Sequence, residues 1–212
     1  MKEILKFRQS VKEFCSKYDM IITPVVRFIL YLIMYMTLNS MTGYSTAFGS
    51  TKVAVLMAVI SAVTSDGIGL GLGALLLTGQ LFSANVEIGV VFLLMFLVLY
   101  CAYIRFFPKT IWIVLFAPVF FLVKLQFLLP ILAGILVGPA AMFSVGIGCI
   151  IYYFMIAAGD YVDALASAGG AEIAASYKFI FEALKGNKEL VLTVVVFAVI
   201  VLIVAIIYKL SF

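Results

Sequence analysis

The sequence predicts an all-α, polytopic integral membrane protein, built as a helical bundle with five to seven membrane segments. Of the 212 residues, 66% are hydrophobic and 11% are charged, whereas a soluble domain is roughly half apolar and about a quarter charged. The apolar residues form continuous runs, as at 90–100 and 190–207, and not the alternating strands of a membrane β-barrel. Helices therefore remain as the way to satisfy backbone polar groups within lipid.

The composition also excludes several kinds of chemistry. The chain has no histidine, and its three cysteines (Cys15, Cys101 and Cys149) are far apart, which argues against imidazole bases and the usual zinc sites. The net charge of +4 is small and does not indicate a nucleic-acid partner. We therefore expect a protein that is not an enzyme and has no catalytic residues, metal or cofactor. Its expected partners are the lipid bilayer and other copies of itself or other membrane subunits.

The N-terminal residues 1–19 combine basic side chains with apolar ones that recur every three or four positions. This pattern is typical of a basic amphipathic helix, either lying on an anionic membrane surface or packed on its own domain. The positive-inside rule places this end in the cytoplasm, and we expect a bacterial-type plasma (inner) membrane. Pro24 suits the first turn of a helix, so the transmembrane domain is predicted over 24–158, with its first span at about 24–41. Arg27 can snorkel from this span to the basic side.

Two stretches of this domain, 53–82 and 110–137, are apolar but broken. The first is interrupted by Ser65-Asp66-Gly67 and the second by Lys124 and Gln126. Each half is shorter than the roughly 20 residues that the hydrocarbon core requires. Full-length spans follow the two stretches, at about 87–104 and 140–158. A broken pair of short apolar runs beside a full-length span thus occurs twice. The lengths of these segments, without any similarity of residues, favour an inverted repeat.

The remaining chain contains its most polar segment and one more span. Residues 159–189 are expected to form a polar loop that holds an amphipathic helix within 171–186, where Lys178 and Glu182 stand four residues apart. A C-terminal transmembrane helix is predicted over 190–208.

Two topologies remain open. In one, 53–82 and 110–137 are re-entrant hairpins that enter from opposite faces, which leaves Arg105 and Lys109 in the cytoplasm as positive-inside prefers. In the other, each stretch crosses as one broken span, and the loop over 159–189 is cytoplasmic instead. The hairpin topology agrees slightly better with the basic residues.

Asp66 and Lys124 are the candidate site residues, because each stands at a break between short apolar runs. Short, Gly/Pro-interrupted segments in two matching halves are typical of a transporter's midplane site, and a carboxylate at depth needs a partner or water. Asp66 is then a proton or cation site, or the partner of Lys124. The alternative is a surface turn at Asp66 and a snorkelling Lys124. The expected supporting residues are Thr64, Ser65, Gly67, Gln80 and Gln126.

These features favour a permease, or the membrane subunit of a transport complex, with a midplane polar site at the two broken helices. The alternative is a non-catalytic membrane scaffold or assembly subunit of a larger machine. A transporter requires a polar cavity that keeps Asp66 from lipid, whereas a scaffold predicts an exposed apolar patch, for instance on 171–185, and an Asp66 that reaches water.

Overall fold

The computed structural model describes residues 18–104, 107, 110–168 and 173–210, and within these residues every regular element is helical. The all-α prediction is therefore confirmed for the described part of the chain. The basic helix predicted over 1–19 and the basic pair Arg105 and Lys109 fall almost entirely outside the described residues. In chain order the helices are α2 (Asp19–Thr42), α3 (Thr51–Val63), α4 (Asp66–Ala84), α5 (Val86–Leu99), the π-helical turn η1 (Tyr100–Ile104), α6 (Ile111–Leu122), α7 (Leu128–Leu136), α8 (Ala141–Ala168), α9 (Ile173–Gly186) and α10 (Lys188–Leu210).

Among the described residues, four helices are long and apolar enough to cross a membrane, which supports a membrane protein. They are Met20–Thr42, Asp66–Ala84, Ala141–Leu165 and Lys188–Leu210. Three further apolar helices have between 10 and 17 residues, and among these α3 has 13 and α6 has 12. At 1.5 Å per residue these two reach about 20 Å and about 18 Å, less than the roughly 30 Å of a hydrocarbon core.

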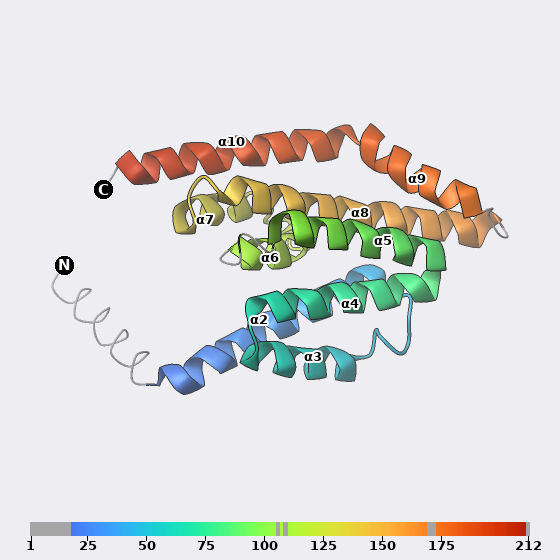
Figure 1. Ribbon diagram of the computed structural model, residues 1–212, viewed down its shortest axis with the longest axis horizontal. Coiled ribbons are helices and arrows are strands. Elements are labelled where there is room, and N and C mark those ends of the chain that lie inside the picture. Colours follow the sequence, from blue (N-terminus) through green and yellow to red (C-terminus); the bar gives the residue numbers. More distant parts are fainter. Residues whose placement is uncertain (1–17, 105–106, 108–109, 169–172, 211–212) are drawn as a thin grey trace.

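Most of the helices lie nearly parallel to one long axis (Figure 1). α2, α3 and α4 form the lower part of this view, α5, α6, α7 and α8 lie above them, and α10 runs along the top. α3 packs against α2 and α4, and α10 packs against α7 and α8. α3 and α4 run in opposite directions and are joined by a tight turn. α2 begins, and α10 ends, at the same side of the molecule.

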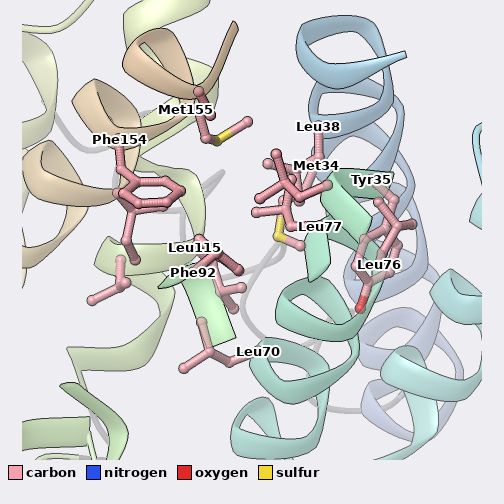
Figure 2. Close-up of a cluster of buried hydrophobic side chains, with 14 of the residues drawn as sticks. Met34, Tyr35, Leu38, Leu70, Leu76, Leu77, Phe92, Leu115, Phe154 and Met155 are labelled. Atoms are coloured by element: carbon pink, nitrogen blue, oxygen red, sulfur yellow. The ribbon is translucent and has the colours of Figure 1, made fainter. Parts of the chain in front are cut away.

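Two clusters of buried side chains hold the bundle together. The larger joins α2, α3, α4, α5, α6, α8 and α9. Figure 2 shows Met34 and Leu77 facing Phe154 and Met155 across it. The smaller joins α6, α7, α8 and α10 around Phe121 and Phe197. α8 contributes to both clusters, and 67% of its most apolar window is buried, against 17% for α10. α8 is therefore the central helix, whereas α10 presents most of its surface outward.

The first break lies slightly earlier than the sequence analysis placed it. Thr64 and Ser65 have extended backbones, and Asp66 and Gly67 are already the first residues of α4. An acidic residue is favourable in the first turn of a helix, because it interacts with the positive end of the helix dipole. The break is thus a two-residue turn, and Asp66 stands on the helix and not in the loop.

Two other predicted boundaries also differ. α2 begins at Asp19, before Pro24, because the chain reaches a helical turn through the bonds from the Ile21 and Ile22 amides to the Tyr18 carbonyl. α8 continues to Ala168, so residues 159–168 are helical and not part of a polar loop. The alanines among these residues favour helix. α9 lies in the segment for which an amphipathic helix was expected.

The second break, residues 123–127, separates α6 from α7. The Lys124 amide donates to the Phe121 carbonyl at 3.1 Å, and the Leu125 amide donates to the Phe120 carbonyl at 2.9 Å. This bonding pattern is a Schellman motif, which ends a helix with one left-handed residue, usually glycine. Here that residue is Lys124, with φ of 59°.

Candidate functional site

Asp66 is held by two side chains of α2. The guanidinium of Arg27 lies 3.5 Å from the Asp66 carboxylate, and the Tyr31 hydroxyl donates to the same oxygen at 3.1 Å. Arg27 also donates to the Thr64 carbonyl at 3.3 Å, so it binds both the acid and the turn before it. The side chains of Arg27 and Asp66 are 38% and 41% exposed. Such exposure weakens an ion pair through solvent screening. The main effect of the Arg27–Asp66 pair is therefore to hold the turn against α2.

A buried set of hydrogen bonds extends this contact between α2, α3 and α4. The Tyr35 hydroxyl donates to the Gly69 carbonyl at 2.9 Å and lies 2.7 Å from the Ser61 hydroxyl. Because a phenol carries one proton, the Ser61 hydroxyl is the donor in the second bond. The rings of Tyr31 and Tyr35 stack with centroids 6.1 Å apart. The surroundings of Asp66 thus cross-link three helices.

Arg27 and Tyr31 are neighbours of Asp66 that were not expected from the sequence. Arg27 was expected to snorkel to the basic side of the membrane. A usable signal was present, since Arg27, Tyr31 and Tyr35 recur every four residues and so share one face of α2. A polar stripe of this kind, on a helix that is otherwise apolar, indicates a neighbouring polar group.

The predicted residues next to Asp66 contribute little through their side chains. The Thr64 hydroxyl donates to the Ile60 carbonyl of its own helix at 2.8 Å. Ser65 is the N-cap residue of α4 but makes no side-chain capping bond. Gly67 faces α6, since a Cβ atom there would lie 3.9 Å from Ile111.

Gln80 belongs to a different set of hydrogen bonds, at the far end of α4. It accepts from the Thr42 hydroxyl at 2.7 Å and donates to the Asn39 side chain, which in turn donates to the Gly49 carbonyl at 3.4 Å. Gln80 stands fourteen positions after Asp66 on α4, a rise of about 21 Å. Gln80 therefore fastens the loop between α2 and α3 and does not reach Asp66.

This loop also approaches α8 through Tyr44. A Cβ atom at Gly159 would lie 3.3 Å from the Tyr44 hydroxyl. Burial raises the pKa of the Tyr44 phenol, and the carboxylates of Asp163 and Asp160 raise it further. The phenol therefore stays protonated at neutral pH.

We predict that Gln80→Leu lowers the free energy of unfolding by about 1–3 kcal/mol, because two hydrogen bonds are lost. The half-buried Asn39 side-chain oxygen loses its donor, and the buried Thr42 hydroxyl keeps only the Leu38 carbonyl as acceptor. The matched control is Ser83→Ala on the same helix, where an exposed hydroxyl donates to the Gly79 carbonyl and the expected change is within about 0.5 kcal/mol. Thermal unfolding of the purified protein in detergent measures both. Equal melting temperatures for the two variants would show that the Gln80 bonds contribute nothing.

Lys124 and Gln126 line a cavity of about 620 Å³ at the second break. Its walls come from the end of α6, the middle of α8 and the first turns of α10. Tyr152 stacks on Phe121 with ring centroids 4.2 Å apart, and the hydroxyls of Tyr153 and Thr193 lie 3.2 Å apart. The lining residues are Phe121, Leu122, Lys124, Gln126, Phe127, Tyr152, Tyr153, Ile156, Glu189, Leu192, Thr193, Val196 and Phe197.

Glu189, Thr193 and the two tyrosines are members of this cavity that the sequence analysis missed. Glu189 was assigned to a polar loop, and the tyrosines were part of a predicted span. Glu189 and Thr193 stand four residues apart on α10, so they share a face. That spacing predicts that the two side chains lie together on one side of α10. Nothing in the sequence relates this pair of residues to Lys124.

The structure does not bring Asp66 and Lys124 together. Gly67 lies beside Ile111, the first residue of α6, whereas Lys124 follows Leu122, the last residue of that helix. The twelve residues of α6 separate these points by about 18 Å. The ion pair of Asp66 is with Arg27.

Within the part of the chain that the structure describes, no three His, Cys, Asp or Glu side chains are grouped so as to hold a metal ion. Comparisons with protein-family models, with curated proteins and with solved structures found no match to this chain. The site is therefore characterised by its geometry: an ion-paired turn at Asp66, and a cavity at Lys124 with apolar and aromatic walls and a few polar groups.

Proposed function

We propose that the chain is an integral membrane permease, or the membrane subunit of a transport complex, whose binding site is the cavity at Lys124. One observation carries the proposal: a lysine that ends α6 in a left-handed conformation lines a cavity of about 620 Å³. The left-handed conformation costs a residue with a side chain about 1–2 kcal/mol. A residue with a side chain in this costly conformation supports a functional role for the Lys124 ammonium group.

The size and walls of the cavity also support binding. Small-molecule sites typically occupy about 300–1,000 Å³, with mostly apolar walls and a few placed polar groups. This cavity has aromatic walls and polar groups at Lys124, Gln126, Glu189 and Thr193. Irregular backbone at membrane depth is tolerated where it lines a water-filled cavity, which fits the break over 123–127.

For the topology, we propose four crossings by α2, α5 with η1, α8 and α10, and two re-entrant hairpins, α3–α4 and α6–α7. These six segments are arranged in a bacterial-type plasma membrane, with the N-terminus in the cytoplasm. Support comes from the directions of the helices in Figure 1, where successive proposed crossings alternate in direction and α3 starts at the side where α4 ends. The shortness of α3 and α6 agrees with hairpins that do not cross completely. α4 is long enough to cross by itself, and we assign it to a hairpin because it returns to the side where α3 starts.

Asp66 has a supporting role in this proposal. Its pairing with Arg27 keeps the turn of the α3–α4 hairpin against α2. The hypothesis of an Asp66–Lys124 pair at mid-depth is replaced by two separate positions, of which only the one at Lys124 binds the transported molecule.

A membrane scaffold is the second candidate, and specific observations favour it. Asp66 is 41% exposed, as expected if it reaches water or a lipid headgroup. The amphipathic α9 presents Phe181, which is 66% exposed. Phe179 on the same helix is also exposed, and neighbouring exposed aromatics suit contact with another membrane subunit.

Thiol labelling tests the permease proposal. Cys15, Cys101 and Cys149 are replaced, and Lys124→Cys is exposed in sealed vesicles to a membrane-impermeant methanethiosulfonate reagent, applied from each face in turn. A permease site opens to both faces, so labelling from either face is expected. The control is Val199→Cys on the outward surface of α10, which should stay unlabelled because thiols in apolar surroundings do not ionise. Labelling of the thiol at position 124 from one face only, or no more than at position 199, would reject the permease and favour the scaffold.

A further inference from the structure

Lys124 and Glu189 place opposite charges at two points of one cavity. Both side chains are exposed, and both line the space of about 620 Å³. Within the described residues, Lys124 and Glu189 do not come within ion-pair distance of each other or of another charged group. Arg27 and Asp66, in contrast, do form an ion pair. A cavity with a separated cation and anion is complementary to a ligand that itself carries both charges.

The cavity also has an apolar side that faces outward. Leu122 and Phe127 at the break are 42% and 57% exposed, and Leu192 on α10 is 67% exposed. These residues line the cavity and continue into the outward surface of α10, of which only 17% is buried in its most apolar window. In a bilayer such a surface is in contact with acyl chains, so the cavity opens sideways into lipid.

The position of Glu189 fixes where the charged part of a ligand belongs. Glu189 lies in the first turn of α10, which is the membrane-interface end of that helix in the proposed topology. Lipid headgroups occupy the same level. The apolar lining residues Leu192 and Val196 lie further along α10, toward the hydrocarbon core. Glu189 near the interface and these apolar residues further along α10 match the order of headgroup amine and acyl chain in a phospholipid.

From this arrangement we propose that the cavity binds a zwitterionic phospholipid with a primary amine, of the phosphatidylethanolamine type. The ammonium of Lys124 binds the phosphate, the carboxylate of Glu189 binds the headgroup amine, and an acyl chain lies along the apolar side of α10. Gln126 and the hydroxyl of Thr193 add hydrogen-bonding groups for the phosphate oxygens. The inference rests on the proposed function, because it names the class of substrate at that site.

Retention of defined lipids tests the inference. The full chain is exchanged in mild detergent into mixtures of phosphatidylethanolamine and phosphatidylglycerol, and the lipids that remain bound are counted by native mass spectrometry. Wild type should retain the ethanolamine lipid preferentially. Lys124→Gln and Glu189→Gln should each lower its retention at least tenfold, whereas the control Lys209→Gln, at the other end of α10, should not.

Two results would overturn the inference. Equal retention of both lipids by wild type would show that the headgroup amine is not recognised. Equal retention of the ethanolamine lipid by Lys124→Gln, Glu189→Gln and Lys209→Gln would show that the two charges do not form the site. The double exchange Lys124→Glu with Glu189→Lys guards against misfolding, and it should regain more retention than either glutamine variant.

Comparison with the thiol labelling separates the two proposals. Labelling of Lys124→Cys from both faces, together with no preference for the ethanolamine lipid, keeps the permease and rejects the lipid as its substrate. Labelling from one face, together with preferential retention that needs both charges, keeps the lipid site and rejects the permease. Movement of a fluorescent ethanolamine lipid between leaflets of proteoliposomes, lost in Lys124→Gln and kept in Lys209→Gln, is the result expected if both hold.

Discussion

Replacing Gly148 with alanine should lower the free energy of unfolding by about 1–3 kcal/mol, the usual cost of overpacking a core. A Cβ atom at Gly148 on α8 would overlap the Cβ atom of Ala117 on α6, and Ala117 is fully buried. Neither atom belongs to a flexible side chain, so the two helices must separate. Because Lys124 follows α6 directly, the same movement displaces one wall of the cavity.

The matched control is Gly146→Ala, nearby on α8 but on another face. There the nearest side-chain atom to an added Cβ is at 3.7 Å, on Val194, an ordinary contact. This variant should be neutral or gain up to about 1 kcal/mol, since alanine favours helix over glycine. Thermal unfolding in detergent compares the two. Equal stability of the variants would mean that α6 and α8 do not pack as closely as described.

Gly69→Ala is expected to cost about as much, at the contact between α2 and α4. An added Cβ would lie 2.6 Å from the ring of Tyr31, and the ring cannot withdraw without weakening its hydrogen bond to Asp66. We expect a loss of about 1–3 kcal/mol. In the Asp66→Cys variant, the thiol at position 66 should also become more reactive to a soluble thiol reagent when Gly69 is replaced by alanine, because the Tyr31 ring that covers this position is displaced.

Gly71→Ala, two residues further along α4, is the control, because an added Cβ there meets no atom within 4 Å. It should be neutral or slightly stabilising. If Gly69→Ala proved as stable as Gly71→Ala, the contact between α2 and α4 at Tyr31 would be looser than described. The comparison separates close packing from the general cost of replacing a glycine in α4.

The helices and their breaks were largely predictable, because continuous apolar runs and their interruptions are local properties of the chain. The turn before Asp66 and the interruption at Lys124 both lie within a residue or two of where the sequence analysis placed them. The extension of α8 to Ala168 was missed, since Asp160 and Asp163 resemble the start of a surface loop. Helix propensity and packing continued the helix through them.

The partners of the two charged residues were not predictable, because pairing depends on how the helices rotate against each other. Asp66 was expected to pair with Lys124, because the two breaks resemble each other. In the structure, Asp66 instead forms an ion pair with Arg27 and accepts a hydrogen bond from Tyr31. Likewise, Glu189 reaches the Lys124 cavity only because α10 packs on α7 and α8. Segment lengths carry no information about such contacts.

The account separates an ion-paired turn at Asp66 from a binding cavity at Lys124. Oxidative crosslinking tests this separation most directly, in a background without Cys15, Cys101 and Cys149. A disulfide requires Cα atoms within about 7 Å. Asp66→Cys with Lys124→Cys should therefore give no disulfide. The positive control is Gly134→Cys with Val204→Cys, where an added Cβ at Gly134 would lie 3.1 Å from the Cβ of Val204. A disulfide between positions 66 and 124 that forms as readily as the control would bring both breaks into one midplane site and contradict the account.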